Sequence, residues 1–144
     1  MSAQWMTQGQ RWRLLAPAGS VVIGISSGPL AVRHAVAQVR ARPAGSPVIL
    51  LDHRRGSLRA RKVAAASALA GGREYVALPS LRAAIVFVED SPNALRFACR
   101  SLVTPPPGLT WTHGPAQAGI WLLRRCPRLA SRLAAGRVVI GRAA

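Results

Sequence analysis

Acidic and imidazole side chains are scarce in this sequence. Its 144 residues include four acids, Asp52, Glu74, Glu89 and Asp90, and three histidines. Metal centres in proteins are built from carboxylates, imidazoles and thiolates, so this chain offers few ligands for one. The histidines also form no recognisable catalytic set with a serine and an acid. We therefore predict neither a bound metal ion nor a hydrolytic active site.

Cysteine is equally rare, and Cys99 and Cys126 are its two residues. They are too few and too far apart in the chain for a zinc site, and no Cys-x-x-Cys motif occurs. Both stand in apolar, helix-like surroundings, where a cysteine is usually an inert thiol of the core. We expect reduced thiols and therefore a cytoplasmic protein.

The sequence also lacks a long apolar run. Arg11 and Arg13 precede an uncharged stretch, residues 14–32, which has the outline of a signal peptide. Proline, glycine and serine interrupt that stretch and leave residues 21–25 as its one continuous apolar block. This block is far shorter than the roughly 20 residues of a membrane-spanning helix. The sequence therefore predicts neither export nor an integral membrane segment.

Positive charge is what the sequence has in abundance. Lysine and arginine number 20, the formal net charge is +16, and Lys62 is the single lysine. The electrostatic field of such a charge attracts polyanions, nucleic acid among them. It also favours an acidic protein partner, which would relieve the repulsion among the chain's own positive charges. An arginine-rich chain with one lysine is also typical of GC-rich bacterial coding, where arginine replaces lysine wherever any cation serves. Both interpretations of the charge stay open.

The first half of the chain has the pattern of alternating strands and helices. Residues 21–25 form a β-branched run typical of a strand buried on both faces. Apolar residues recur at helical spacing over residues 30–42, and residues 47–52 form a second buried strand that ends on an acid. This order predicts a right-handed parallel crossover.

An antiparallel hairpin is expected next. Residues 57–70 are predicted to form a helix that ends at Gly71-Gly72. Residues 73–78 and 83–89 then have the composition of strands, and the residues between them are too few for a crossover.

The remaining elements complete one domain. We expect a helix over residues 93–103, a proline-rich surface loop over 104–114, a helix over 116–135 that Pro127 interrupts, and a short strand over 137–140.

The predicted fold class is α/β. Residues 1–19 are expected to form an N-terminal arm, and residues 20–144 a single domain with a mixed sheet and flanking helices. One parallel crossover plus one antiparallel hairpin make this domain Rossmann-like.

Polar and glycine residues follow both predicted parallel strands. Gly24, Ser26, Ser27 and Gly28 come after the first strand, and Asp52 and His53 end the second. In open α/β sheets this edge binds phosphates at a helix N-terminus and places an acid near a ribose hydroxyl. Asp52 could also orient His53 as a general base. The alternatives are an ordinary turn after the first strand and a solvated loop after the second, in which the acid pairs with an arginine.

Two groups of arginines are candidates for binding a polyanion. They stand directly after the second strand and along the last helix, and comprise Arg54, Arg55, Arg124, Arg125, Arg128 and Arg132. Exposed cations in such a row can hold a phosphate backbone or an anionic surface. The alternative is a solvated helix face with no ligand.

The order of elements resembles the carboxyl-terminal half of class I S-adenosylmethionine-dependent methyltransferases. In that family a helix leads into a Leu-(Lys/Arg)-Pro-Gly-Gly turn, followed by a strand, a helix ending near Ala-Gly-Phe, and a closing antiparallel hairpin. Here Arg42-Pro43-Ala44-Gly45-Ser46 and Ala70-Gly71-Gly72 occupy the two turns. The first departs from Pro-Gly-Gly by one residue, and in the second Arg73 stands where an aromatic residue is usual. The likeness covers about residues 20 to 90.

The resemblance implies a methyltransferase-like protein. In this alignment the family's cofactor-binding half would lie upstream, so the chain is expected to be truncated or catalytically inactive. A competing alignment takes residues 21–25 as the family's first strand and makes Asp52 the ribose-binding acid, with S-adenosylmethionine as cofactor. The alternative functions are a non-enzymatic cationic binder of nucleic acid or another polyanion, and an interaction subunit of an acidic partner protein.

Overall fold

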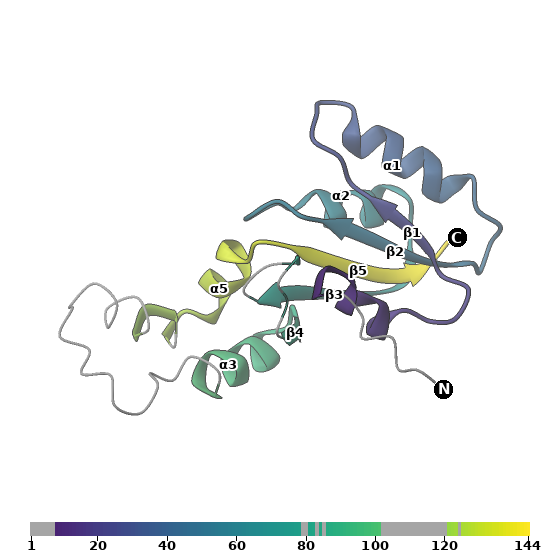
Figure 1. Cartoon of the computed structure of the whole chain (residues 1–144). Coiled ribbons are helices and arrows are strands. Elements are labelled where there is room, and N and C mark those ends of the chain that lie inside the picture. The colour runs from purple at the N-terminus through teal and green to yellow at the C-terminus, as the bar shows by residue number, and fades with distance from the viewer. Residues whose placement is uncertain (1–7, 79–80, 83, 85, 102–120, 124) are drawn as a thin grey trace.

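A five-stranded mixed sheet forms the centre of the protein (Figure 1). The computed structural model describes residues 8–78, 81–82, 84, 86–101, 121–123 and 125–144. The strand order is β1-β2-β5-β3-β4, and the strands are β1 (Val21–Gly24), β2 (Pro47–Asp52), β3 (Ala70–Leu78), β4 (Val86–Glu89) and β5 (Arg137–Arg142). β1 and β2 pair in parallel, whereas β5 runs antiparallel to both β2 and β3, and β3 to β4. The predicted mixed α/β fold, with its parallel crossover and its hairpin, is therefore confirmed.

The last strand of the chain occupies the middle of the sheet. β5 lies between β2 and β3, and it extends to Arg142 rather than ending at residue 140. Its apolar residues Val138 and Val139 are buried on opposite faces, because successive side chains of a strand alternate. This central strand connects the parallel half of the sheet to the antiparallel half.

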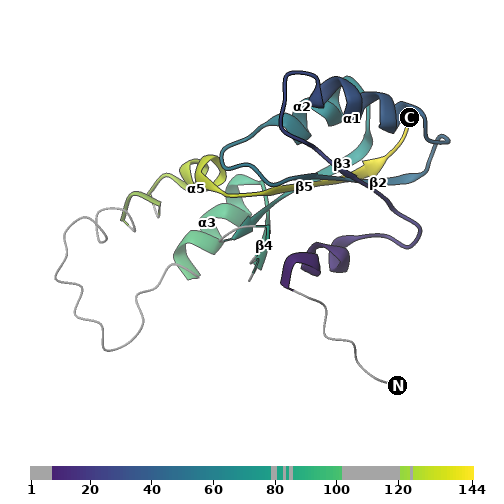
Figure 2. The same cartoon turned by 45° about the horizontal axis from the view of Figure 1, so that its top comes forward.

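Helices cover one face of the sheet and a short 3₁₀ helix lies against the other (Figure 2). The helical elements are η1 (Gln8–Leu15), α1 (Ala31–Arg40), α2 (Arg59–Ala66), α3 (Pro92–Ser101) and α5 (Pro127–Leu133). Trp12 of η1 is buried against Ile49 and Leu51 of β2. Part of the segment expected to be an arm therefore contributes to the core.

Two helices differ from the sequence prediction in their bounds. α2 ends at Ala66, several residues before Gly71, because Ala68 adopts a left-handed backbone conformation with φ of 52°. In the region predicted as one interrupted helix, α5 begins at Pro127, which has no N–H to lose at a helix start. The predicted proline-rich loop, residues 104–114, lies outside the described residues.

Two apolar clusters lie on the helix-covered face. Val48, Leu50 and Val139 pack beneath α1 and α2, while Val76 and Val88 pack against α3. The register pairs Asp52 with Arg137 and Arg137 with Val76, so these residues point to the same side of the sheet. The helix pairs α1/α2 and α3/α5 therefore cover the same face, and a polar cluster lies between them.

Candidate functional site

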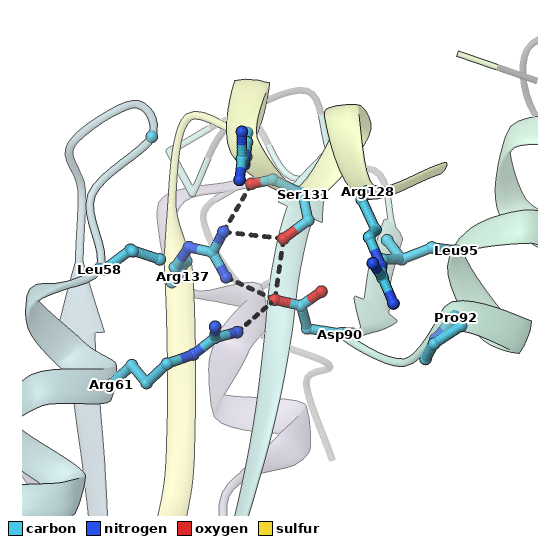
Figure 3. A pocket seen from close by; sticks show the side chains of 10 residues that line it. Leu58, Arg61, Asp90, Pro92, Leu95, Arg128, Ser131 and Arg137 are labelled. Carbon is cyan, nitrogen blue, oxygen red and sulfur yellow. Dashed lines mark hydrogen bonds and ion pairs between the residues drawn. The ribbon is translucent and has the colours of Figure 1, made fainter. Parts of the chain in front are cut away.

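A cleft of about 510 Å³ opens between α2 and the α3/α5 pair. Its walls come from the loop after β2, the start of α2, the turn between β4 and α3, and α5 (Figure 3). The polar side chains that line it are Arg61, Asp90, Arg128, Ser131, Arg132 and Arg137. Four of the six are arginines, so the cleft is a concentrated source of positive charge.

Arg137 forms the floor of the cleft and is 1% exposed. Its Nη1 donates to Glu74 and, at 2.6 Å, to Oδ2 of Asp90. Its Nη2 donates to the carbonyl oxygen of Ser131 at 2.6 Å and to the Ser131 hydroxyl at 2.8 Å. The Nε atom has no acceptor among the described residues. A buried guanidinium needs such partners, because an isolated charge in the interior is strongly destabilising.

Arg61 reaches the same carboxylates from α2. Its Nε lies 2.8 Å from Oε2 of Glu74, and its Nη2 lies 3.0 Å from Oδ2 of Asp90. The hydrogen bond to Glu74 raises the pKa of Arg61 above its ordinary value, against the opposing effect of burial. The side chain is still 53% exposed, so it bridges the buried cluster and the solvent.

Asp90 is the carboxylate on which the cluster converges. Its backbone N–H donates to the carbonyl oxygen of Glu74 at 2.8 Å, which fixes the turn after β4 beside β3. Its Oδ2 also accepts a hydrogen bond from the Ser131 hydroxyl at 2.9 Å. In Figure 3 the other carboxylate oxygen points toward the side of the cleft that carries Arg128.

Arg128 and Arg132 project from α5 and are exposed. Neither side chain forms a hydrogen bond or an ion pair with another part of the chain that the structure describes. Figure 3 shows Arg61 and Arg128 on opposite sides of Asp90. Glu74 and Asp90 balance two of the four guanidinium groups, so the cleft keeps an excess of positive charge that could hold an anion.

The structure brings together the two groups of arginines predicted from the sequence. Arg54 and Arg55 are exposed in the loop after β2, and Gly56 of that loop donates its N–H to the carbonyl oxygen of Ala134 at 3.1 Å. Gly56 has φ of 65°, and a Cβ placed on it would lie 2.9 Å from the backbone oxygen of Arg132. Only glycine allows this close approach without displacement, and the loop thus lies against the end of α5.

The structure does not place the other two predicted arginines, Arg124 and Arg125, in this group. Arg125 stacks on Trp121, with its Cζ 4.7 Å from the ring centroid, so its cation is already engaged with an aromatic face. Arg124 lies outside the described residues.

The predicted nucleotide-binding residues lie at the carboxyl ends of β1 and β2. Arg59 donates from Nη1 to the carbonyl oxygen of Ser26 at 3.0 Å, which places the loop of Gly24, Ser26, Ser27 and Gly28 beside the start of α2. Asp52 is completely buried, accepting hydrogen bonds from the Ser57 hydroxyl at 2.5 Å and from the Arg54 N–H at 3.1 Å. His53 is exposed. The Asp52 carboxylate therefore stabilises its own loop.

The loop after β1 also reads Gly24-Ile25-Ser26-Ser27-Gly28, which matches Gly-x-Ser-x-Gly. In α/β-hydrolases this motif places a nucleophilic serine on a strained turn between a strand and a helix. Ser26 lacks that strain, since Ala68 is the one non-glycine residue with positive φ in the described part of the chain. Ser26 has no hydrogen bond to a histidine there either. The geometry does not support a serine nucleophile.

Sequence reasoning did not find the polar cluster of Glu74, Asp90, Ser131 and Arg137. The composition was the one indication of this cluster. With four acids and 20 basic residues in the chain, a buried acid is expected to pair with several arginines. The sequence does not show which arginines these are, since Asp90 and Arg137 come together only through the pairing of distant strands.

The described residues contain no group of three potential metal ligands and no helix long and apolar enough to cross a membrane. Cys99 is buried, Cys126 is exposed, and both are free thiols. Burial raises the pKa of the Cys99 thiol above its ordinary value.

In comparisons with protein-family models, curated proteins and solved structures, no match to this chain was found.

Proposed function

We propose that this protein is a non-enzymatic binder of nucleic acid that contacts the phosphate backbone through an arginine surface, defined as Arg54, Arg55, Arg128 and Arg132. The observation that carries the proposal is the junction of Gly56 with the end of α5. It joins two distant segments that carry exposed cations, and of these cations Arg128 and Arg132 line the cleft. Arginine suits such contacts because its planar fork of donors matches the oxygens of a phosphate.

The composition of the cleft supports binding rather than acid–base chemistry. Its carboxylate Asp90, together with Glu74 behind it, is already held by Arg61 and Arg137. Both carboxylates are therefore engaged in charge-assisted hydrogen bonds within the protein. The described residues that line the cleft include no histidine, lysine or cysteine. These residues offer cations and one engaged acid, which suits an anionic ligand.

Salt dependence tests the proposal. Four phosphate contacts predict a slope of log affinity against log salt of about −3.6, so affinity for a generic duplex should fall about a hundredfold between about 50 and 200 mM salt. Fluorescence anisotropy with a labelled duplex measures this directly. No detectable binding at the low-salt end would overturn the proposal.

A matched pair of double variants locates the surface. Arg128→Gln/Arg132→Gln should make the slope shallower by about 1.8, because each lost phosphate contact removes about 0.9. The control Arg33→Gln/Arg73→Gln removes the same charge from exposed residues on α1 and β3. The control should leave the slope unchanged, and an equal loss in both variants would show a diffuse charge effect instead.

Methyltransferase-like activity is the second candidate. It is favoured by the order of elements from β1 to β4 and by the contact between Arg59 and Ser26, which places the loops after β1 and β2 side by side. Isothermal titration with S-adenosylmethionine separates its two forms. Heat of binding would support a donor site that includes Ser26 and Gly28, while no heat at high micromolar concentration leaves a catalytically inactive relative.

The setting that we propose is the cytoplasm, and the two free thiols support it because that compartment keeps cysteines reduced. The arginine surface would also suit an acidic partner protein. In that case the chain should aggregate when it is expressed alone and become soluble on co-expression with the partner, with no affinity for a duplex.

A further inference from the structure

We infer that the cleft between α2 and α5 binds a phosphate monoester whose body carries a hydroxyl or amino group, such as a nucleoside 5′-monophosphate or the phosphorylated 5′ end of a strand. This inference rests on the proposed function in so far as it names a ligand class for two arginines of the same surface, Arg128 and Arg132. It adds a pocket that distinguishes a terminal phosphate from the phosphodiesters of a backbone.

The charge of the cleft matches a dianion. Four guanidinium groups line it, and Glu74 and Asp90 compensate two of them through the contacts of Arg61 and Arg137. The remaining two positive charges equal the charge of a phosphate monoester, which approaches −2 at neutral pH because its second pKa is about 6. A phosphodiester carries only one negative charge per phosphate. The electrostatic match is therefore better for a terminal phosphate.

Three arginines supply free donors at the walls of the cleft, in addition to the buried Nε of Arg137. Arg61 uses Nε and Nη2 on the two carboxylates, so its Nη1 has no acceptor among the residues that the structure describes. The side chains of Arg128 and Arg132 donate to no acceptor in the described part of the chain. Since Arg61 and Arg128 lie on opposite sides of Asp90 in Figure 3, a compact anion between them can receive hydrogen bonds from both walls.

Asp90 gives the cleft a second recognition element. Its side chain is only 7% exposed, and its Oδ2 already accepts hydrogen bonds from three side chains. The other oxygen points toward the Arg128 side of the cleft. A carboxylate oxygen repels a bare anion but accepts a hydrogen bond from a hydroxyl or amino group. Asp90 therefore favours a ligand that presents a donor near its phosphate.

Apolar side chains complete the walls. Leu58, Pro92 and Leu95 line the cleft, and Leu58 is 43% exposed. A ligand body that covers Leu58 would bury apolar surface, which is favourable by about 25 cal/mol per Å². The cleft volume of about 510 Å³ lies within the range of small-molecule sites. Together the walls accommodate more than an isolated phosphate ion.

Calorimetric titrations with four probes at low salt test the inference: AMP, adenosine, cyclic 3′,5′-AMP and inorganic phosphate. AMP should bind at least tenfold more tightly than each of the other three. Equal affinity for AMP and the cyclic diester would overturn the requirement for a dianion. Equal affinity for AMP and inorganic phosphate would overturn the role of Asp90 and the apolar walls.

The same double variants locate the site. Arg128→Gln/Arg132→Gln should reduce AMP affinity at least tenfold, whereas Arg33→Gln/Arg73→Gln should leave it within twofold of the parent protein. A similar loss in both variants would contradict the cleft as the site. Lowering the pH from 7.5 to 5.5 should weaken AMP binding and leave cyclic AMP unaffected, because only the monoester gains a proton in that range.

Oligonucleotides separate the two sources of the phosphate. A strand with a 5′ phosphate that binds at least tenfold more tightly than its 5′-hydroxyl counterpart identifies a strand end, whereas tight binding of AMP alone identifies a free nucleotide. Failure of AMP and of the 5′ phosphate, with duplex binding intact, would overturn this inference alone. Failure of duplex binding, with AMP binding intact, would overturn only the proposed function.

Discussion

Arg137 and Asp90 lie 47 residues apart in the chain, and Nη1 of the first is 2.6 Å from Oδ2 of the second. Arg137 begins the central strand, and Asp90 follows the edge strand β4. Their ion pair, shared with Glu74 and Arg61, lies between the two apolar clusters of one sheet face. It therefore determines how α5 and the turn before α3 are placed around the cleft.

Replacing Arg137 should be strongly destabilising. Arg137→Met leaves Glu74 and Asp90 in a largely buried position with only Arg61 to balance them. Breaking a buried ion pair in this way costs about 3–5 kcal/mol in the free energy of unfolding. Urea denaturation measures the loss. Arg73→Met is the control, since Arg73 is exposed and should change stability by no more than about 0.5 kcal/mol. Equal effects of the two variants would contradict the role assigned to the ion cluster.

The junction between the loop after β2 and α5 can be tested with two glycines. Gly56 and Gly71 have nearly the same backbone, with φ of 65° and 63°, but only at Gly56 does a Cβ meet another atom, the Arg132 oxygen at 2.9 Å. Gly71→Ala should cost about 1–2 kcal/mol from backbone strain alone. Gly56→Ala should cost at least about 1 kcal/mol more and weaken duplex binding as the loop moves away from α5. Identical losses of stability would show that the contact is dispensable.

The loop of Asp52 depends on the Ser57 hydroxyl. Ser57→Ala removes one of the two hydrogen bonds to a completely buried carboxylate, which should cost about 1–3 kcal/mol. Ser20→Ala removes a hydroxyl that donates to a backbone oxygen at an exposed site, and should cost no more than about 0.5 kcal/mol. Thermal unfolding of the two variants compares them, and a loss for Ser57→Ala as small as that of the control contradicts this prediction.

The two cysteines should differ in reactivity. Burial hides the Cys99 thiol and raises its pKa, so less thiolate is present at any given pH, while Cys126 is exposed. Iodoacetamide at pH 8 should therefore label Cys126 rapidly in the native protein, and both cysteines in urea. Mass spectrometry measures the extent of labelling at each site. Because folding raises this pKa, the contribution of Cys99 to stability is retained at neutral pH and lost as the pH rises above the ordinary thiol pKa of about 8.5. Equal labelling rates of the two native thiols would be inconsistent with the buried site.

The parts of the fold that depend on local pattern were predictable. β1 and β2 are continuous apolar runs, but only β2 is buried on both faces as such a run implies. The same prediction was wrong for β1, because it is an edge strand and its Val22 is 43% exposed. The position of β5 was not predictable, because its sequence shows a strand but not the strands that it pairs with. The early end of α2 at the left-handed Ala68 had no signal in the residue types either.

The candidate site was predictable in its exposed part. Arg54, Arg55, Arg128 and Arg132 follow from charge and position alone, because solvated cations are recognisable without knowing the fold. Asp90 and Arg137 required the pairing of β3 with β4 and β5 before they could meet. A buried ion cluster is a tertiary feature, so neither residue had a local pattern that would reveal it.

The central claim is that arginines from two segments act as one phosphate-binding surface, and the salt slope of duplex binding tests it most directly. The slopes of the parent protein, Arg54→Gln/Arg55→Gln, Arg128→Gln/Arg132→Gln and the quadruple variant should be compared at equal protein concentration. Each double variant should make the slope shallower by about 1.8, and the quadruple variant by about 3.6, because every lost phosphate contact contributes about 0.9. A double variant that leaves the slope unchanged would contradict the claim, because its arginines would then contact no phosphate.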